Sequence, residues 1–141
     1  MKEITFRAWD KISKEISNVK ILDIFKRRVG LGWNSYDGIT WRNIEDVIIM
    51  HYIGLKDKNG REIYEGDIVL IDGGDSLVGI KQQYVVRYDN MNTSYCFETN
   101  NGDKIYLTSF GNPDFFIKNK VEVIGNIYEN PELIILLSDD A

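Results

Sequence analysis

The chain of 141 residues has little of what many active sites and secreted proteins require. It contains one cysteine, Cys96, and one histidine, His51. A single cysteine excludes an intrachain disulfide and a cysteine metal cluster, and a single histidine excludes a metal site built on two histidines. We therefore expect a protein of the reducing cytoplasm that carries no cofactor and no metal.

Positive charge and long hydrophobic runs are also scarce. Acidic residues number 22 against 17 basic ones, which gives a formal net charge of -5. This balance argues against a general affinity for phosphate backbones, which depends on clustered Lys and Arg. Apolar runs such as 133–137 are far shorter than the roughly 20 residues that span a bilayer, and the N-terminus lacks an apolar signal core. We expect a protein that makes no membrane contact.

The residues that are plentiful favour sheet over helix. Hydrophobic residues make up 43% of the chain and aromatic residues 12%, with eight Tyr and six Phe. Aromatic and β-branched residues are enriched in strands. Turn signals recur along the chain, and no alternation of helices with strands indicates a parallel sheet. The sequence therefore predicts a mainly β protein with little helix.

The segment 54–69 carries the most specific local signals. Asn59-Gly60 predicts a tight reversal, because both residues tolerate positive φ. Glu65-Gly66-Asp67 predicts a second reversal, and a β-branched strand begins at Ile68. Two closely spaced turns before a buried strand are typical of a small, strongly bent antiparallel sheet that closes as a barrel.

The remaining segments complete this prediction. Residues 1–50 are expected to form an N-terminal β-hairpin extension, and residues 51–141 a small β-barrel domain in the style of SH3-like folds. Within the extension, 43–50 suits either a short helix or the start of a strand. We expect a loop over 108–120 that tucks aromatic side chains under the sheet. The extension has little of its own to bury and should lie on a neighbour, which makes the protein an oligomer if that neighbour is a second copy.

Three segments, in this order, resemble the YopX family of phage and prophage proteins. They are Phe6-Arg7-Ala8-Trp9-Asp10, the stretch from Tyr52 to Val69, and the stretch from Glu122 to Leu133. His51 and Ile53 depart from the family pattern, which has Gln and Thr there. The resemblance implies a mostly β, phage-derived cytoplasmic protein that self-associates. It supplies no agreed reaction and no catalytic residues.

Four acidic residues, Asp57, Glu62, Glu65 and Asp67, lie close enough in sequence to suggest a divalent-ion site or a carboxylate pair. Their setting favours a structural role. Asp57 and Asp67 occupy turns, where Asp commonly accepts hydrogen bonds from its own local backbone. Glu62 and Glu65 flank Ile63-Tyr64 in the manner of a solvent face.

The lone cysteine and histidine fit structural roles better than catalytic ones. Cys96 lies between Tyr95 and Phe97 in a predicted strand, which favours a small buried residue over a nucleophile. We interpret His51 as a polar side chain at a sheet edge or interface. We expect no enzymatic activity.

Aromatic and charged side chains form a candidate interaction surface. Its members are Arg7, Trp9, Asp10, Trp33, Tyr36 and Trp41. Trp9 fits either a recognition surface or an anchor that docks the extension, and we favour the anchor. Our first hypothesis is a non-enzymatic module that self-associates and contacts an unknown phage or host protein.

Two other functions remain open. A nucleic-acid accessory factor would use basic residues gathered on one face, namely Lys26, Arg27, Arg28, Lys118 and Lys120. A metal-dependent hydrolase would use the acidic set, and it is the least favoured of the three.

Overall fold

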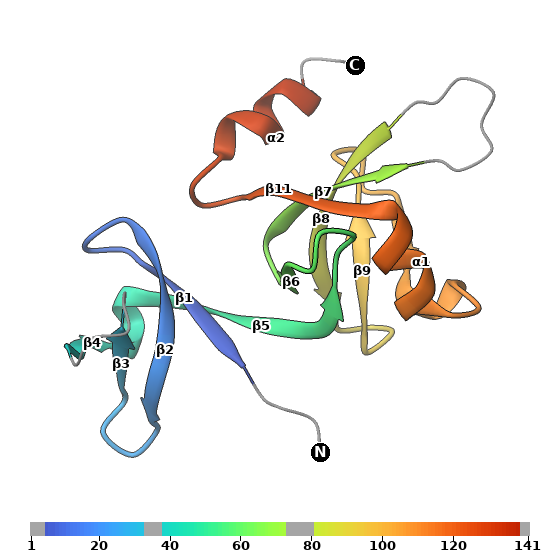
Figure 1. Cartoon of the computed structure of the whole chain (residues 1–141). Coiled ribbons are helices and arrows are strands. Elements are labelled where there is room, and N and C mark those ends of the chain that lie inside the picture. The colour runs from blue at the N-terminus through green and yellow to red at the C-terminus, as the bar shows by residue number, and fades with distance from the viewer. Residues whose placement is uncertain (1–4, 33–37, 73–80, 139–141) are drawn as a thin grey trace. The chain divides into compact units, whose positions relative to one another are not determined.

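The computed structural model describes residues 5–32, 38–72 and 81–138 and confirms the mainly β prediction. These residues form two antiparallel sheets, with the strand orders β4-β3-β2-β1-β5-β6 and β10-β9-β8-β7-β11 (Figure 1). The chain divides into two compact units, residues 1–52 and 53–141.

The strands and helices have the following bounds. The first sheet contains Phe6–Asp10 (β1), Glu15–Asp23 (β2), Arg28–Gly32 (β3), Thr40–Asn43 (β4), Val47–Lys56 (β5) and Glu62–Tyr64 (β6). The second contains Asp67–Asp72 (β7), Lys81–Asp89 (β8), Ser94–Glu98 (β9), Lys104–Tyr106 (β10) and Val121–Asn126 (β11). The helical segments are the 3-10 turns Ile44–Asp46 (η1) and Leu107–Ser109 (η2) and the α-helices Pro113–Lys120 (α1) and Pro131–Ser138 (α2). Segment 43–50 is therefore a short 3-10 turn followed by a strand.

The first unit is a curled sheet that encloses a core of its own. Side chains alternate along β1, so Ala8 and Asp10 face inward and are fully buried. The core residues are Ala8, Val29, Leu31 and Val47. Asp10 in β1 contacts Arg42 in β4, although two strands lie between them. In a flat sheet β1 and β4 would be about 14 Å apart, so the contact requires this face to be concave.

This core corrects the expectation that residues 1–50 have too little to bury. Val19, Leu22, Ile44 and Ile49 pack around the four buried residues. The unit also has more strands than a hairpin, because β3, β4 and the first half of β5 join β1 and β2. Curling explains the difference, since one layer of strands can enclose apolar side chains when its buried face is concave.

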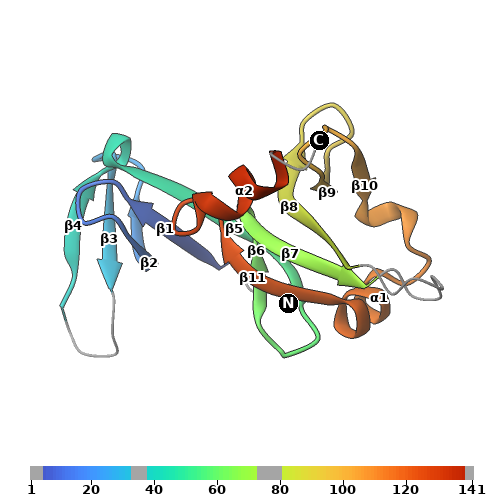
Figure 2. The same cartoon turned by 90° about the horizontal axis from the view of Figure 1, so that it is seen from above.

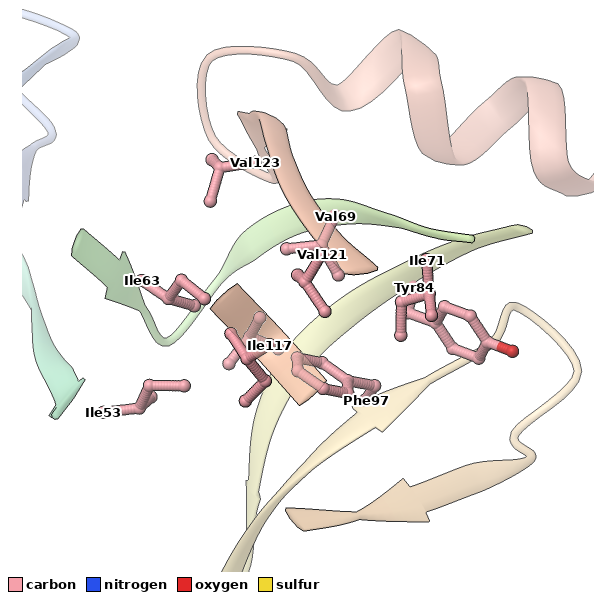
Figure 3. Close-up of a cluster of buried hydrophobic side chains, with 10 residues drawn as sticks. Ile53, Ile63, Val69, Ile71, Tyr84, Phe97, Ile117, Val121 and Val123 are labelled. Atoms are coloured by element: carbon pink, nitrogen blue, oxygen red, sulfur yellow. The ribbon is translucent and has the colours of Figure 1, made fainter. Parts of the chain in front are cut away.

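The second unit has the larger core, shown in Figure 3. It contains Ile53, Ile63, Val69, Ile71, Tyr84, Val86, Phe97, Ile117, Val121 and Val123. Ile117 from α1 lies beside Phe97 from β9, and both are fully buried. The side chains that line this core come from strands of both sheets and from α1. Helix α1 leads directly into β11 (Figure 2).

The structure corrects the prediction of a closed barrel. In the part of the chain that the structure describes, neither sheet closes, and β10 and β11 remain the edges of the second sheet. Strand β10 has only three residues before the chain turns into η2 and α1. The chain therefore returns to β11 through helical segments, and no strand bridges the two edges.

The predicted loop over 108–120 contains helix α1. Asn112 caps the helix through Oδ1, which accepts a 3.2 Å hydrogen bond from the amide of Phe115, and Pro113 occupies the first turn. Phe110 stacks on Phe116 at 4.1 Å between ring centroids, and both pack against the core. The aromatic side chains are thus tucked in as expected, but a helix positions them.

A polar cluster joins the β8–β9 turn to β10. The Tyr106 hydroxyl donates a 2.6 Å hydrogen bond to Asp89 Oδ2, and Asn92 Nδ2 donates to both side chains. The bond from Tyr106 is the largest cause that lowers the pKa of Asp89, to about 2. Lys104 Nζ, 3.8 Å from the same oxygen, adds to this effect.

This cluster predicts an acid-sensitive hairpin. The folded pKa of Asp89 lies below its ordinary value of 3.8. Its carboxylate therefore stabilises the fold at higher pH, and that contribution is lost as the pH falls from about 4 to about 2. Tyr106→Phe should raise the pKa of Asp89 toward its ordinary value, measured from the carboxyl carbon shift in an NMR titration. Tyr88→Phe, the same change next to Asp89, should leave the pKa near 2; equal shifts in both variants would refute the assignment.

Candidate functional site

The turn between β5 and β6 is closed by its own backbone. The Asp57 amide donates to the carbonyl of Arg61 at 2.8 Å, and the Gly60 amide donates to the carbonyl of Asp57 at 3.0 Å. Gly60 has a φ of 80°, a left-handed value that glycine adopts without steric cost. The Asn59-Gly60 reversal is therefore where the sequence predicts it.

The Asp57 carboxylate fixes this turn and also binds strand β11. Oδ1 accepts hydrogen bonds from the amides of Asn59 at 2.9 Å and Arg61 at 2.8 Å. Oδ2 accepts a 2.9 Å hydrogen bond from the amide of Val123, 66 positions away in the chain. Asp57 is 1% exposed, so its charge is satisfied by protein donors instead of water.

Other groups of the turn complete a cover over the outer edge of β11. The Lys58 amide donates to the carbonyl of Val121 at 2.9 Å, and Arg61 Nη1 donates to the carbonyl of Val123 at 3.4 Å. An open edge would present these backbone groups to another chain. The turn occupies them with two side chains and one amide, and we call this arrangement the edge clasp (Asp57, Lys58, Arg61, Val121 and Val123).

The second reversal of the signature is also held by a buried carboxylate. Asp67 Oδ2 accepts a 2.8 Å hydrogen bond from the amide of Tyr64, and Gly66 between them has a φ of 85°. Gly66 donates to the carbonyl of Val86 and accepts from the amide of Ile127. Asp67 and its turn thus connect β6 to β8 and to the end of β11.

In the C-terminal motif, residues 122–133, asparagine side chains accept the backbone hydrogen bonds. Asn126 Oδ1 accepts from the amides of Tyr128 and Glu129, at 3.0 and 2.9 Å. Asn130 Oδ1 accepts a 3.1 Å bond from the Asn126 amide. A Cβ at Gly125 would lie 2.8 Å from Cγ of Asn130, so only glycine leaves room for this side chain.

The acidic set of the signature therefore does not converge. Asp57 and Asp67 serve separate turns, while Glu62 is exposed and Glu65 half-buried. Among residues 5–32, 38–72 and 81–138, no three His, Cys, Asp or Glu side chains lie close enough together to hold a metal ion.

Removing the Asp57 acceptor should destabilise the fold strongly. Asp57→Asn replaces one carboxylate oxygen with a donor, so at least one buried amide loses its acceptor. The expected cost is about 2–4 kcal/mol in the free energy of unfolding, from urea denaturation at neutral pH. The control Glu62→Gln removes the same charge from an exposed position and should change stability by less than about 0.5 kcal/mol. Similar effects in both variants would show that the edge clasp is not what stabilises this region.

The structure places Asp10 inside the first unit. Its side chain is fully buried, and Arg42 Nε lies 3.1 Å from both carboxylate oxygens. Ser13 Oγ and the Ile12 amide also donate to the carboxylate, at 2.7 and 3.1 Å. Burial alone would raise the pKa of Asp10, but the hydrogen bonds, of which that from Arg42 is the largest, outweigh it and lower the pKa.

Arg7 and Trp9 face away from that core. Both are half-buried, and Arg7 Nη2 lies 3.7 Å from the sulfur of Met50. The strand register puts Arg7, Gly30 and Trp41 on the same outer face of the sheet. Trp41 is 39% exposed, with the Arg28 guanidinium 4.0 Å from its ring centroid. Trp33 and Tyr36 lie outside the described residues.

Arg42 is the partner of Asp10 that the sequence did not reveal. No local spacing connects positions 10 and 42, because the pair forms only when the sheet curls. No local spacing connects Arg61 with Val123 in the edge clasp either. Arg42 stands between Trp41 and Asn43 in the short strand β4, and neither neighbour marks it as the partner of a buried carboxylate.

The buried pair predicts a large and pH-dependent effect. Arg42→Met leaves Asp10 buried without its cation and should cost about 3 kcal/mol or more at neutral pH. The pKa of Asp10 should then rise, because its carboxyl stays buried after the cation is gone. The stability deficit should therefore shrink as the pH is lowered toward 4, where the carboxyl becomes protonated.

A matched control is the exposed pair of Arg27 and Glu45, whose side chains are 68% and 63% exposed. Arg27→Met should cost less than about 1 kcal/mol. Thermal or urea unfolding at pH 7 and pH 4 measures both variants. A deficit for Arg42→Met that is no larger than that of the control would contradict this account.

The two residues most suited to catalysis are placed for packing. Cys96 is 1% exposed, and burial raises the pKa of its thiol, which keeps the thiol protonated. The His51 ring lies 4.9 Å from that of Phe6 in a tilted contact, and its residue is exposed.

The basic residues divide between the two units. Lys26, Arg27 and Arg28 belong to the first unit. Arg27 Nη2 lies 2.9 Å from Glu45 Oε1, and Arg28 Nε lies 3.6 Å from Asp23 Oδ2. Lys118 and Lys120 lie in α1 of the second unit. Acidic partners thus reduce the local positive charge of the cluster.

The fold and these contacts define a class of small proteins with two open antiparallel sheets and polar turns that bind backbone groups. The family model described as YopX protein matches residues 5–135, so the chain belongs to the YopX family, as its three motifs indicate.

Two solved structures are similar over nearly their whole length. Protein EF1440 from Enterococcus faecalis has 27% identity and a TM-score of 0.60, with 95% of this chain and 99% of that chain covered. Protein yopX from Bacillus subtilis has 17% identity and a TM-score of 0.57, with 94% and 98% covered, and it shares the fold. Among curated proteins, no relative matches the chain. No helix in the described ranges is long and apolar enough to cross a bilayer.

Proposed function

We propose that this protein is a non-enzymatic interaction module of phage or prophage origin that self-associates in the bacterial cytoplasm and contacts a phage or host protein. One observation carries the proposal. Among the residues that the structure describes, the buried carboxylates are those of Asp10, Asp57 and Asp67, and all three accept hydrogen bonds from groups of the fold itself. They are fold determinants, and a substrate would have to displace those donors to reach them.

The titratable groups support the same interpretation. Catalytic acids, bases and nucleophiles gather in clefts, where burial and neighbouring charges shift their pKa values toward the working pH. Here the shifts point away from neutrality. The pKa of Asp10 is lowered, that of Asp89 lies at about 2, and that of Cys96 is raised.

Self-association is supported by apolar side chains on the surface. Exposed large hydrophobic residues of the first unit include Ile21, Ile39 and Trp41, and Phe115 in α1 is 67% exposed. Trp and Arg are enriched among residues that dominate binding energy at interfaces, and Arg28 stacks on Trp41. A second protein surface would remove these side chains from water.

Sedimentation velocity of the full chain, from low micromolar to submillimolar concentration, tests the proposal. We expect the weight-average mass to rise with concentration above that of the 16.3 kDa chain. Salt should alter this association only modestly, because its centre is apolar. A monomer at every concentration would refute self-association. A strongly salt-dependent shift of labelled single-stranded nucleic acid would favour the accessory-factor hypothesis instead.

A further inference from the structure

We propose that a second copy of this chain binds to the outer face of β2, β3 and β4, in a two-fold symmetric pair centred on Trp41. The inference rests on the proposed self-association and names the surface that carries it. That surface, here called the Trp41 face, consists of Ile21, Asp23, Arg28, Gly30, Ile39 and Trp41.

The strand register builds the apolar centre of the Trp41 face. Ile21 in β2 lies opposite Gly30 in β3, and Gly30 lies opposite Trp41 in β4. These three residues therefore share one face of adjacent strands. Ile21 and Trp41 are each 39% exposed, and Ile39 is 41% exposed. The opposite face of the same strands carries the buried core residues Val29 and Leu31.

Gly30 makes this centre continuous. A Cβ at Gly30 would lie 2.9 Å from Cγ2 of Ile39, 3.3 Å from Cβ of Ile21 and 3.4 Å from Cζ3 of Trp41. The side chains of Ile39, Ile21 and Trp41 thus surround the position that a side chain at Gly30 would occupy. The result is one shallow apolar surface, which a partner can cover as a unit, instead of separate side chains.

A pair of opposite charges borders the apolar centre. Arg28 lies opposite Asp23 in the next row of the same face, with Nε 3.6 Å from Asp23 Oδ2. The side chains of Arg28 and Asp23 are 39% and 27% exposed. Stacking on Trp41 at 4.0 Å orders the Arg28 guanidinium before any partner arrives.

This charge pattern favours a second copy over other partners. In an isologous pair the same patch meets itself, so Arg28 of each copy can face Asp23 of the other. A nucleic acid would be repelled by Asp23, and a lipid surface would remove both charged groups from water without a partner. The Trp41 face covers only part of three strands, so we expect a small interface and a weak, concentration-dependent dimer.

Truncation of Trp41 tests the location. Trp41→Ala should raise the dissociation constant of the pair about 30-fold or more, as expected for a central aromatic residue. The control Phe25→Ala removes an aromatic side chain that is 96% exposed in the β2–β3 turn and is not one of the residues of the Trp41 face, and it should change the constant less than two-fold. Circular dichroism and thermal unfolding establish that both variants are folded.

Charge reversal tests the two-fold pairing. Asp23→Arg and Arg28→Asp should each weaken self-association at least ten-fold, because like charges then face one another. An equimolar mixture should restore association to within a few-fold of the wild type. In the mixed pair, Arg28 of the first variant meets Asp23 of the second, and the two introduced side chains also carry opposite charges. Mixing cannot repair a folding defect, so this rescue separates interface from fold.

The outcomes separate the two proposals. If the wild type associates while Trp41→Ala is unchanged or the mixture gives no rescue, the Trp41 face is the wrong surface and self-association stands. If the wild type is monomeric throughout, both are overturned.

Discussion

The second unit depends on one carboxylate that joins distant parts of the chain. Asp57 accepts from the turn that contains it and from Val123 in β11, and it is almost completely buried. Such an acceptor is strong because it is charged, and its removal leaves buried amides without a hydrogen-bond acceptor. The Asn59-Gly60 turn is therefore both a reversal and the cover of a sheet edge. The most characteristic residues of the chain serve backbone geometry.

The same logic recurs at the other motifs. Asp10 joins β1 to Arg42 in β4, Asp67 fixes the turn before β7, and Asn126 organises the chain after β11. In each case a buried polar side chain accepts hydrogen bonds that would otherwise be missing where strands end or bend. A motif rich in Asp and Asn can thus specify a fold without specifying a reaction.

The sequence predicts the local features well and the distant ones poorly. The Asn59-Gly60 reversal and the turns at Asp57 and Asp67 follow from local conformational preference. No local pattern encodes the curl of the first sheet, the Asp10–Arg42 pair or the edge clasp on β11. These features depend on contacts between residues that are far apart in the chain: Asp10 and Arg42 are separated by 32 positions, and Asp57 and Val123 by 66. The sequence does not predict helix α1, because eight residues are too few to show a clear helical period of apolar positions. Asn112 and Pro113 are nevertheless typical of a helix start. For the candidate surface, composition indicates aromatic contacts, but only the register shows that Trp41 and Asp10 lie on opposite faces of the sheet.

The most direct measurement is native-state hydrogen exchange at the amide of Val123. If Asp57 covers the edge of β11, this amide should exchange only through the same large opening that exposes central residues such as Val69, with a similar opening free energy. Exchange at the rate of an uncovered edge amide, far faster than that of Val69, would contradict the claim that the signature carboxylate holds the fold together.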